Sequence, residues 1–296
     1  MSTGSETDGR PKKRVRDRIE ETFARYEPKT ESVPIPRFDE TSRTPDEAAR
    51  VQAPIVTQTS TGVPGLDPVL EGGFPDRSLM LVLGETGSHY EAFVRQILYH
   101  HLLNKGKVAH YLVESLSSDI LQDMGRFGWK IEDSVQDGKW VFVNLRTPDL
   151  HKLAQLMPKN LSEGFALDVS RDLSNLKTDL LTKVKEDRRT VLELGHLMHE
   201  YPLLEILSLI LYWRTAVRVH GGVHFALLPI GVHPEPSINA LKHLADGVFE
   251  LHVEEDKRTG GLVLSASKLS SIKTPLKISL KLRGSGLVAE TPEKIS

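Results

Sequence analysis

The sequence predicts an α/β fold in which helices flank a mostly parallel β-sheet, with antiparallel strands added toward the C-terminal end. From about residue 57, short apolar runs alternate with helix-length runs, which is the order expected of strands joined by helical crossovers. The short runs are apolar at consecutive positions, as strands buried on both faces are. Later in the chain apolar and polar residues alternate instead, which predicts the antiparallel extension.

The individual elements follow from period and length, and they form one core domain. Buried strands are predicted at 79–83, 107–113, 140–145, 190–194 and 223–228. Helices of a length that suits right-handed crossovers are predicted at 90–103, 116–127, 150–157, 173–185, 203–220 and 237–244. Alternating strands are predicted at 246–253, 261–268 and 276–283.

The N-terminal segment has a different composition from the rest of the chain. Prolines lie among many charged residues with few apolar clusters, which predicts a disordered or partner-docking tail. Val15, Ile19, Phe23 and Tyr26 have the spacing of one helical face, so a short docking helix is an alternative to a fully solvated segment. The predicted segments are a tail at 1–55, a core domain at 56–290 and a C-terminal tail at 291–296.

The composition excludes several classes of site. The 296 residues include no cysteine, which excludes disulfides and thiolate metal sites and predicts a cytoplasmic location. The formal net charge of -2 gives no general attraction to nucleic acid, and no apolar run is long enough to span a membrane. The histidine pairs His196/His199 and His220/His224 lack a zinc spacing, so no metal site is predicted. Neither nucleic acid nor a membrane is expected as a partner.

One loop lies where a phosphate-binding loop belongs, between the strand at 79–83 and the next helix. The pattern G-x-x-x-x-G-K-[ST] needs glycines to let backbone N–H groups surround phosphates, a lysine for the β and γ phosphates and a hydroxyl for magnesium. Here His89, Tyr90 and Glu91 replace the second glycine, the lysine and the hydroxyl residue. The predicted vestigial nucleotide loop consists of Gly84, Glu85, Thr86, Gly87, Ser88, His89, Tyr90 and Glu91.

The segment before this loop carries a resemblance to a known family. Residues 60–67 read S-T-G-V-P-G-L-D and residues 72–75 read G-G-F-P, which resembles the corresponding segment of KaiC/RecA-superfamily (RadA-like) ATPases, members of the P-loop NTPase superfamily. The resemblance continues in shorter segments at 108–115, 127–129, 245–248 and 281–284. It covers about residues 57–288 and implies a RecA-like fold.

The resemblance also implies positions for catalytic and interface residues. Glu114 matches the first of the family's paired catalytic glutamates, and Ser115 replaces the second. Glu193 stands where the family's Walker B strand ends in aspartate. Lys281 and Arg283 match a K-h-R-G segment that in the family lies at a subunit boundary and reaches the neighbouring subunit's nucleotide.

These departures from the family pattern predict a function without chemistry. We expect a non-hydrolysing pseudo-ATPase, not an enzyme, with Glu114 and Glu193 as vestigial residues and no ATP, magnesium or other cofactor. Its expected role is that of a regulatory or scaffolding subunit, as in signal transduction, that assembles with itself or with an active KaiC/RecA-like paralogue. A further protein partner is expected to bind the N-terminal tail.

Two alternatives to the pseudo-ATPase remain open from the sequence. The first is a weak or atypical ATPase of the KaiC family that uses Glu114 and Glu193 for magnesium and water activation. The second is a nucleic-acid-binding accessory protein of recombination or repair that acts through the basic part of the tail.

Overall fold

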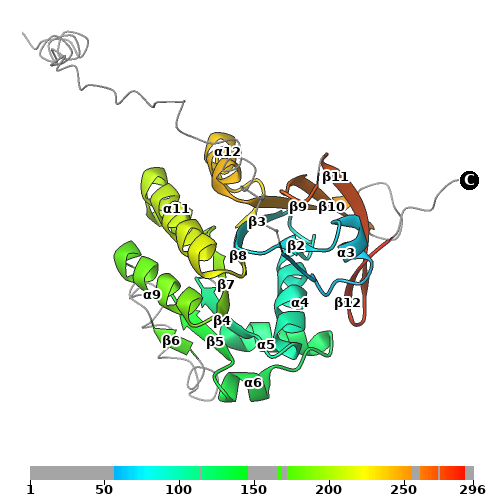
Figure 1. The fold of residues 1–296 in the computed structure, drawn as a ribbon, viewed down its shortest axis with the longest axis horizontal. Coiled ribbons are helices and arrows are strands. Elements are labelled where there is room, and N and C mark those ends of the chain that lie inside the picture. The colour runs from blue at the N-terminus through cyan, green and yellow to red at the C-terminus, as the bar shows by residue number, and fades with distance from the viewer. Residues whose placement is uncertain are drawn as a thin grey trace, which may run out of the picture. The chain divides into compact units, whose positions relative to one another are not determined.

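A ten-stranded sheet forms the centre of the protein in the computed structural model (Figure 1). The described residues are 57–113, 115–145, 166–168 (backbone alone), 172–254, 261–272 and 274–290. The strands are β1 (Gln58–Thr59), β2 (Phe74–Pro75), β3 (Ser78–Gly84), β4 (Lys107–Leu112), β5 (Trp140–Asn144), β6 (Ala166–Asp168), β7 (Arg188–Glu193), β8 (Val223–Pro229), β9 (Gly247–Glu254), β10 (Gly261–Lys268), β11 (Leu276–Arg283) and β12 (Gly286–Ala289). The helices are α3 (Leu66–Val69), α4 (Tyr90–Leu103), α5 (Ser117–Arg126), α6 (Glu132–Gln136), α9 (Leu173–Lys185), α10 (Leu197–Glu200), α11 (Leu203–His220) and α12 (Glu235–Leu244).

The large sheet has the strand order β12-β11-β10-β9-β3-β8-β7-β4-β5-β6. The strands from β9 to β6 pair in parallel, whereas β10, β11 and β12 pair antiparallel beyond β9. In the central strand β3, Leu81 lies opposite Ala226 of β8 and Val248 of β9. The predicted fold class, a mostly parallel sheet with antiparallel C-terminal strands, is therefore confirmed.

Each face of the sheet carries its own apolar core. Met80 and Val82 of β3 pack with Phe93 of α4 on one face, and Leu79 and Leu81 pack on the other face, since successive side chains of a strand point in opposite directions. Residues of α4 and α5 belong to the first core, and residues of α9, α11 and α12 belong to the second (Figure 1). Because both faces are covered, all seven residues of β3 are buried.

The segment that carries the family resemblance is held by hydrogen bonds of Asp67. Its carboxylate accepts from the Ser60 hydroxyl at 2.6 Å and from the backbone N–H of Thr61 at 2.8 Å. Gly65 precedes α3 in the left-handed conformation (φ 80°), and a Cβ there would lie 2.6 Å from the carbonyl oxygen of Ala289 in β12. This motif therefore has a structural role in joining the start of the domain to its last strand.

A buried side chain attaches the C-terminal strands to α4. The amide of Gln96 accepts from the backbone N–H of Leu287 at 2.7 Å and donates to the carbonyl of the same residue at 3.0 Å. Because β12 lies at the edge of the large sheet, it has no neighbouring strand on one side, and these two hydrogen bonds take the place of those that such a strand would make. They thereby fix β11, the neighbour of β12, relative to the start of α4.

The predicted element bounds agree with the structure to within about two residues for most elements. The helices predicted at 90–103, 173–185 and 203–220 and the strands predicted at 261–268 and 276–283 have the predicted bounds. The short elements β1, α3, β2, α6, β6, α10 and β12 were not predicted. The tail at 1–55, the helix at 150–157 and the tail at 291–296 lie outside the described residues. The division into these segments, like the cytoplasmic location, stays a prediction. No helix in the described part of the chain is long and apolar enough to cross a membrane.

Candidate nucleotide site

The loop at 84–89 joins β3 to α4 at the carboxyl ends of the parallel strands, the edge where open α/β sheets bind ligands. Gly87 has a φ of 84°. His89, which stands where the phosphate-loop pattern has its second glycine, also adopts the left-handed conformation, with a φ of 56°. The backbone thus keeps the bend that a glycine permits, at a cost of about 1–2 kcal/mol for a residue with a side chain.

Tyr90 occupies the position of the pattern's lysine, and its ring packs directly on the start of the loop. A Cβ built on Gly84 would lie 2.2 Å from Cγ and Cδ1 of Tyr90, so only glycine at position 84 permits this packing. The lysine side chain of a phosphate-binding loop lies over the same loop. An aromatic ring therefore lies where the pattern places an ammonium group, and the residues present do not fit ATP in the usual phosphate cradle.

A second contact ties the loop to β9. The carboxylate of Glu85 lies 2.7 Å from Nδ1 of His252 and accepts from the backbone N–H of Val253 at 3.0 Å. The hydrogen bond with His252 and then that with Val253 lower the pKa of Glu85, so its carboxylate is ionised at neutral pH. The loop therefore presents a negative charge on the side of β9.

Glu193 at the end of β7 lies beside the end of β4. Its carboxylate accepts from the hydroxyl of Ser115 at 3.0 Å and from the backbone N–H of Val113 at 3.3 Å. Burial raises the pKa of Glu193 in spite of these hydrogen bonds. His110 Nε2 lies 3.9 Å away, but burial lowers the pKa of this histidine well below its usual range, so it carries no charge at neutral pH. Glu193 is thus held in a fixed position by β4.

Two charged residues near the loop, Arg95 and Asp123, contact the site but were not predicted from the sequence to belong to it. Arg95 of α4, whose side chain is 7% exposed, lies 3.5 Å from Glu91 and 3.5 Å from Asp123 of α5. The spacing of Glu91 and Arg95, four residues apart on a helix, was the signal available in the sequence. Glu91 is therefore neutralised by its own helix.

The structure brings most of the predicted site residues to one edge of the sheet. Glu193 lies beside Ser115, the residue that replaces the second catalytic glutamate. Glu114 lies outside the described residues. Among the described residues no group of His, Asp and Glu side chains could hold a metal ion.

A cavity of about 580 Å³ lies next to the loop and joins two sets of predicted residues. Gly87 and His89 line it from the loop, and Lys281 and Arg283 line it from β11. Lys281 pairs with Glu290, which also lines the cavity. The side chain of Arg283 makes no hydrogen bond or ion pair with any residue that the structure describes. The family resemblance implied a subunit boundary for these two cations, and the sequence did not predict that they share a cavity with the loop of their own chain.

Sequence comparison shows which known proteins this part of the chain is similar to. Residues 59–194, from the start of the domain to the end of β7, match the family model described as "ATPase: KaiC". This part of the chain is similar to KaiC-like ATPase domains. A UPF0273 protein of Sulfurisphaera tokodaii is 22% identical over 236 residues, covering 76% of this chain and 80% of that protein.

Shorter matches are found in other relatives. A UPF0273 protein of Pyrococcus furiosus is 29% identical over 98 residues, which span 33% of this chain and 40% of that protein. The circadian clock oscillator protein KaiC of Acaryochloris marina is 33% identical over 95 residues, covering 32% of this chain and 18% of KaiC. A KaiC-like protein of Pyrococcus horikoshii shares the fold, with a TM-score of 0.60 at 20% identity over 80% of this chain and all of the other.

The comparisons correct one prediction. The expectation that the chain is not an enzyme is wrong, because residues 59–194 match a family model that is described as that of an ATPase. The prediction rested on three substitutions in one loop, at His89, Tyr90 and Glu91, whereas the match extends from β1 to β7. The expected KaiC-like character of the domain is confirmed.

Proposed function

We propose that this KaiC-like chain is an atypical ATPase that binds ATP in the cavity between the loop at 84–89 and β11. The observation that supports the proposal is the joint lining of this cavity by His89 of the loop and by Lys281 and Arg283 of β11. Its volume of about 580 Å³ lies within the range of about 300–1,000 Å³ that small-molecule sites have.

Electrostatics favour this placement of the phosphates over the usual one. A pair of unit charges about 4 Å apart is worth about 4 kcal/mol near a protein surface, and a ligand of micromolar affinity has only about 8 kcal/mol in total. Loss of the loop lysine therefore removes a large share of the affinity for a polyanion. Lys281 and Arg283 line the cavity on the far side of the loop. Because Lys281 is paired with Glu290, the unpaired charge of Arg283 is the one that replaces the charge of the loop lysine.

A role within an assembly of subunits belongs to the same proposal. Arg283 is exposed at the end of β11 and has no partner in the described part of the chain, so it is free to approach a neighbouring molecule. The resemblance to the family assigns the same residue and Lys281 to a subunit boundary. We therefore propose that the chain assembles with itself or with an active KaiC/RecA-like paralogue, in a regulatory or scaffolding position in which these two residues complete a nucleotide site.

Calorimetric titration with magnesium ATP tests the proposal. The wild-type chain is expected to bind ATP, and Lys281→Gln with Arg283→Gln is expected to weaken binding at least about tenfold, since a hydrogen bond to a charged group is worth about 1.5–3 kcal/mol. Lys277→Gln is the matched control because Lys277 is exposed on the same strand and does not line the cavity. Equal affinity in the double variant would exclude the cavity as the site.

The same variants separate binding within one chain from binding between chains. If the cations act on a neighbour's nucleotide, ATP affinity depends on protein concentration, and the dependence disappears in the double variant. If they act within the chain, the affinity is the same at all concentrations. Sedimentation of the chain with and without ATP measures the assembly directly.

A further inference from the structure

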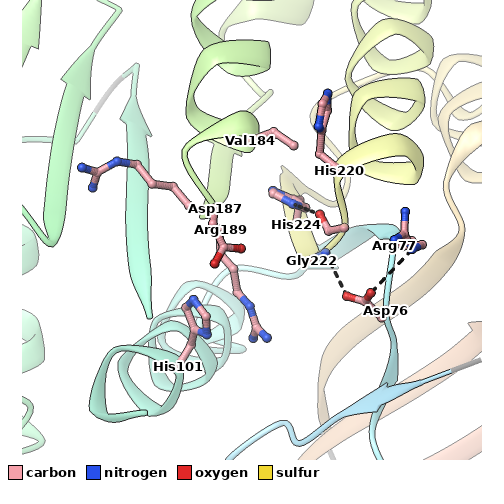
Figure 2. A pocket seen from close by; sticks show the side chains of 11 residues that line it. Asp76, Arg77, His101, Val184, Asp187, Arg189, His220, Gly222 and His224 are labelled. Atoms are coloured by element: carbon pink, nitrogen blue, oxygen red, sulfur yellow. Dashed lines mark hydrogen bonds and ion pairs between the residues drawn. The ribbon is translucent and has the colours of Figure 1, made fainter. Parts of the chain in front are cut away.

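A second cavity lies at the opposite edge of the sheet from the loop at 84–89. Its volume is about 250 Å³, and it is bounded by the amino ends of β3, β7 and β8 and the C-terminal ends of α4, α9 and α11 (Figure 2). The residues that line it with polar side chains are Asp76, Arg77, His101, Asp187, Arg188, Arg189, His220 and His224. None of these residues belongs to the site described above.

The charged residue buried in this cavity is Arg189. Its residue is 8% exposed, and its guanidinium makes no hydrogen bond or ion pair with any described residue. Burial lowers the pKa of Arg189 to about 10, so the group is still charged at neutral pH. Figure 2 shows the guanidinium pointing toward His101 of α4. Its nitrogens are not among the fully buried polar atoms that lack a partner, so the guanidinium faces the cavity, where water or a ligand can reach it.

Arg188, the residue before Arg189, has the partners expected of an arginine with a structural role. The guanidinium of Arg188 lies 2.8 Å from the carboxylate of Glu186 and donates to the carbonyl of Gly138 at 2.9 Å. Both arginines are in β7, and successive side chains of a strand point to opposite faces. The lack of partners is therefore specific to Arg189.

Helix ends do not explain the buried cation. Cations are favoured near helix C-termini, where carbonyls lack partners. The last carbonyls of the three helices already have donors: Gly106 donates to His101 at 3.0 Å in α4, Asp187 donates to Val184 at 3.1 Å in α9, and Arg77 donates to Val219 at 2.9 Å in α11. Arg189 is not needed to cap any of them.

The carboxylates around the cavity do not neutralise Arg189 either. Asp76 accepts from the backbone N–H of Gly222 at 2.8 Å and lies 3.9 Å from Arg77 (Figure 2). Asp187 is exposed to solvent. The charges of Asp76 and Asp187 oppose the effect of burial on the pKa of Arg189, but no ion pair joins either carboxylate to its guanidinium.

His101 and His224, which line the cavity, are neutral at physiological pH. Burial, and then the charge of Arg189, lower the pKa of His101 to about 3. Burial lowers the pKa of His224 to about 4. Nδ1 of His224 accepts from the backbone N–H of Thr190 at 3.0 Å, which leaves Nε2 to donate to the carbonyl of Gly221 at 3.1 Å. Of His101, Arg189 and His224, only Arg189 is therefore charged, and its guanidinium has free donors.

We propose that this cavity binds a small oxyanion, a carboxylate or phosphate group, through the guanidinium of Arg189. The planar fork of an arginine matches the paired oxygens of these groups. The cavity is smaller than the range of about 300–1,000 Å³ for drug-sized ligands, so the ligand is a free anion or a small organic acid. A nucleotide is expected at the other edge of the sheet.

Thermal unfolding and calorimetry of the full chain with inorganic phosphate and, separately, with acetate test this site. At least one anion is expected to raise the unfolding temperature saturably. Arg189→Gln is expected to weaken that binding at least about tenfold, and Arg189→Lys is expected to weaken it less. Arg126→Gln, which removes an exposed arginine of α5, is the charge-matched control and is expected to bind like wild type.

Two measurements keep the test independent of folding and of the nucleotide site. Without added anion, Arg189→Gln is expected to unfold at the same temperature as wild type or higher, because it removes a charge that burial disfavours and breaks no hydrogen bond or ion pair with a described residue. The double variant of Lys281 and Arg283 is expected to keep its phosphate or acetate binding. The proposal is overturned if neither anion binds the wild type, or if Arg189→Gln binds as well as wild type does.

Discussion

Replacement of His110 by phenylalanine is expected to change the pH dependence of stability. His110 lies on β4 and is 1% exposed. The centroid of its ring is 6.1 Å from that of Trp140 and 5.8 Å from that of Phe142. Neither ring nitrogen of His110 has a hydrogen-bond partner among the described residues. Burial lowers its pKa well below the usual 6.5. The environment thus favours an aromatic ring without a charge.

The sign of the effect follows from proton binding. Because the pKa of His110 is lower in the folded protein than in the unfolded chain, the unfolded chain binds the additional proton as the pH falls below 6.5. The stability contributed by the neutral histidine is complete above this pH and is lost as the pH falls toward the folded pKa. At pH 5.0 the loss is about 2 kcal/mol, from 1.36 kcal/mol for each of about 1.5 pH units.

Urea unfolding at pH 7.5 and pH 5.0 measures this loss. The stability of wild type is expected to fall between the two pH values by about 2 kcal/mol more than that of His110→Phe. His243→Gln, which removes an exposed histidine of α12, is the control and is expected to behave like wild type. If His110→Phe and wild type lose the same stability between the two pH values, the assignment of a neutral, buried His110 is wrong.

Other consequences concern the loop and its surroundings. Gln96→Leu removes both hydrogen bonds to Leu287 and leaves two buried backbone groups without partners. We therefore expect the free energy of unfolding, measured with urea, to fall by about 2–4 kcal/mol. A decrease below about 0.5 kcal/mol would contradict the role given to these two hydrogen bonds. Glu193→Gln removes a carboxylate whose pKa is raised by burial, so the variant should be at least as stable as wild type in urea unfolding at pH 7.5. A lower stability of the variant at this pH would refute this. Tyr90→Lys replaces the ring packed on Gly84 by an ammonium group, so calorimetry should show at least about tenfold tighter binding of magnesium ATP than in wild type. Unchanged affinity would show that the ring does not block the loop.

Much of the fold could be predicted because local patterns determine it. The bounds of α4, α9 and α11 follow from apolar periodicity, and the buried strands follow from short continuous apolar runs. The strand at 286–289 was missed because four residues carry too little pattern, and its pairing depends on a contact with Gln96 that lies 191 positions away in the sequence.

The site was predictable only in part. The position of the loop and of Glu193 follows from the motif and the fold, since both lie where parallel strands end. The shared cavity of His89, Lys281 and Arg283 depends on how β11 is placed against the loop, which no local pattern contains. Likewise Arg188 and Arg189 look alike in the sequence, and only the packing distinguishes the paired residue from the unpaired one.

The function was the least predictable part. Three substitutions in a loop, considered alone, favour loss of activity, because they remove the groups that hold phosphates and magnesium in the usual pose. The comparisons reverse that conclusion, since they take the whole run from β1 to β7 into account. Phosphates held by Lys281 and Arg283 of β11 would explain both the altered loop and the cavity next to it.

Phosphate release from magnesium ATP by the purified full chain tests the central claim most directly. We expect release above the rate in buffer for wild type and for the control Lys277→Gln, and a decrease of at least about tenfold when Lys281 and Arg283 are both replaced by glutamine. The account would be contradicted if the wild-type chain released no phosphate above the rate in buffer, or if the double variant released it as fast as wild type.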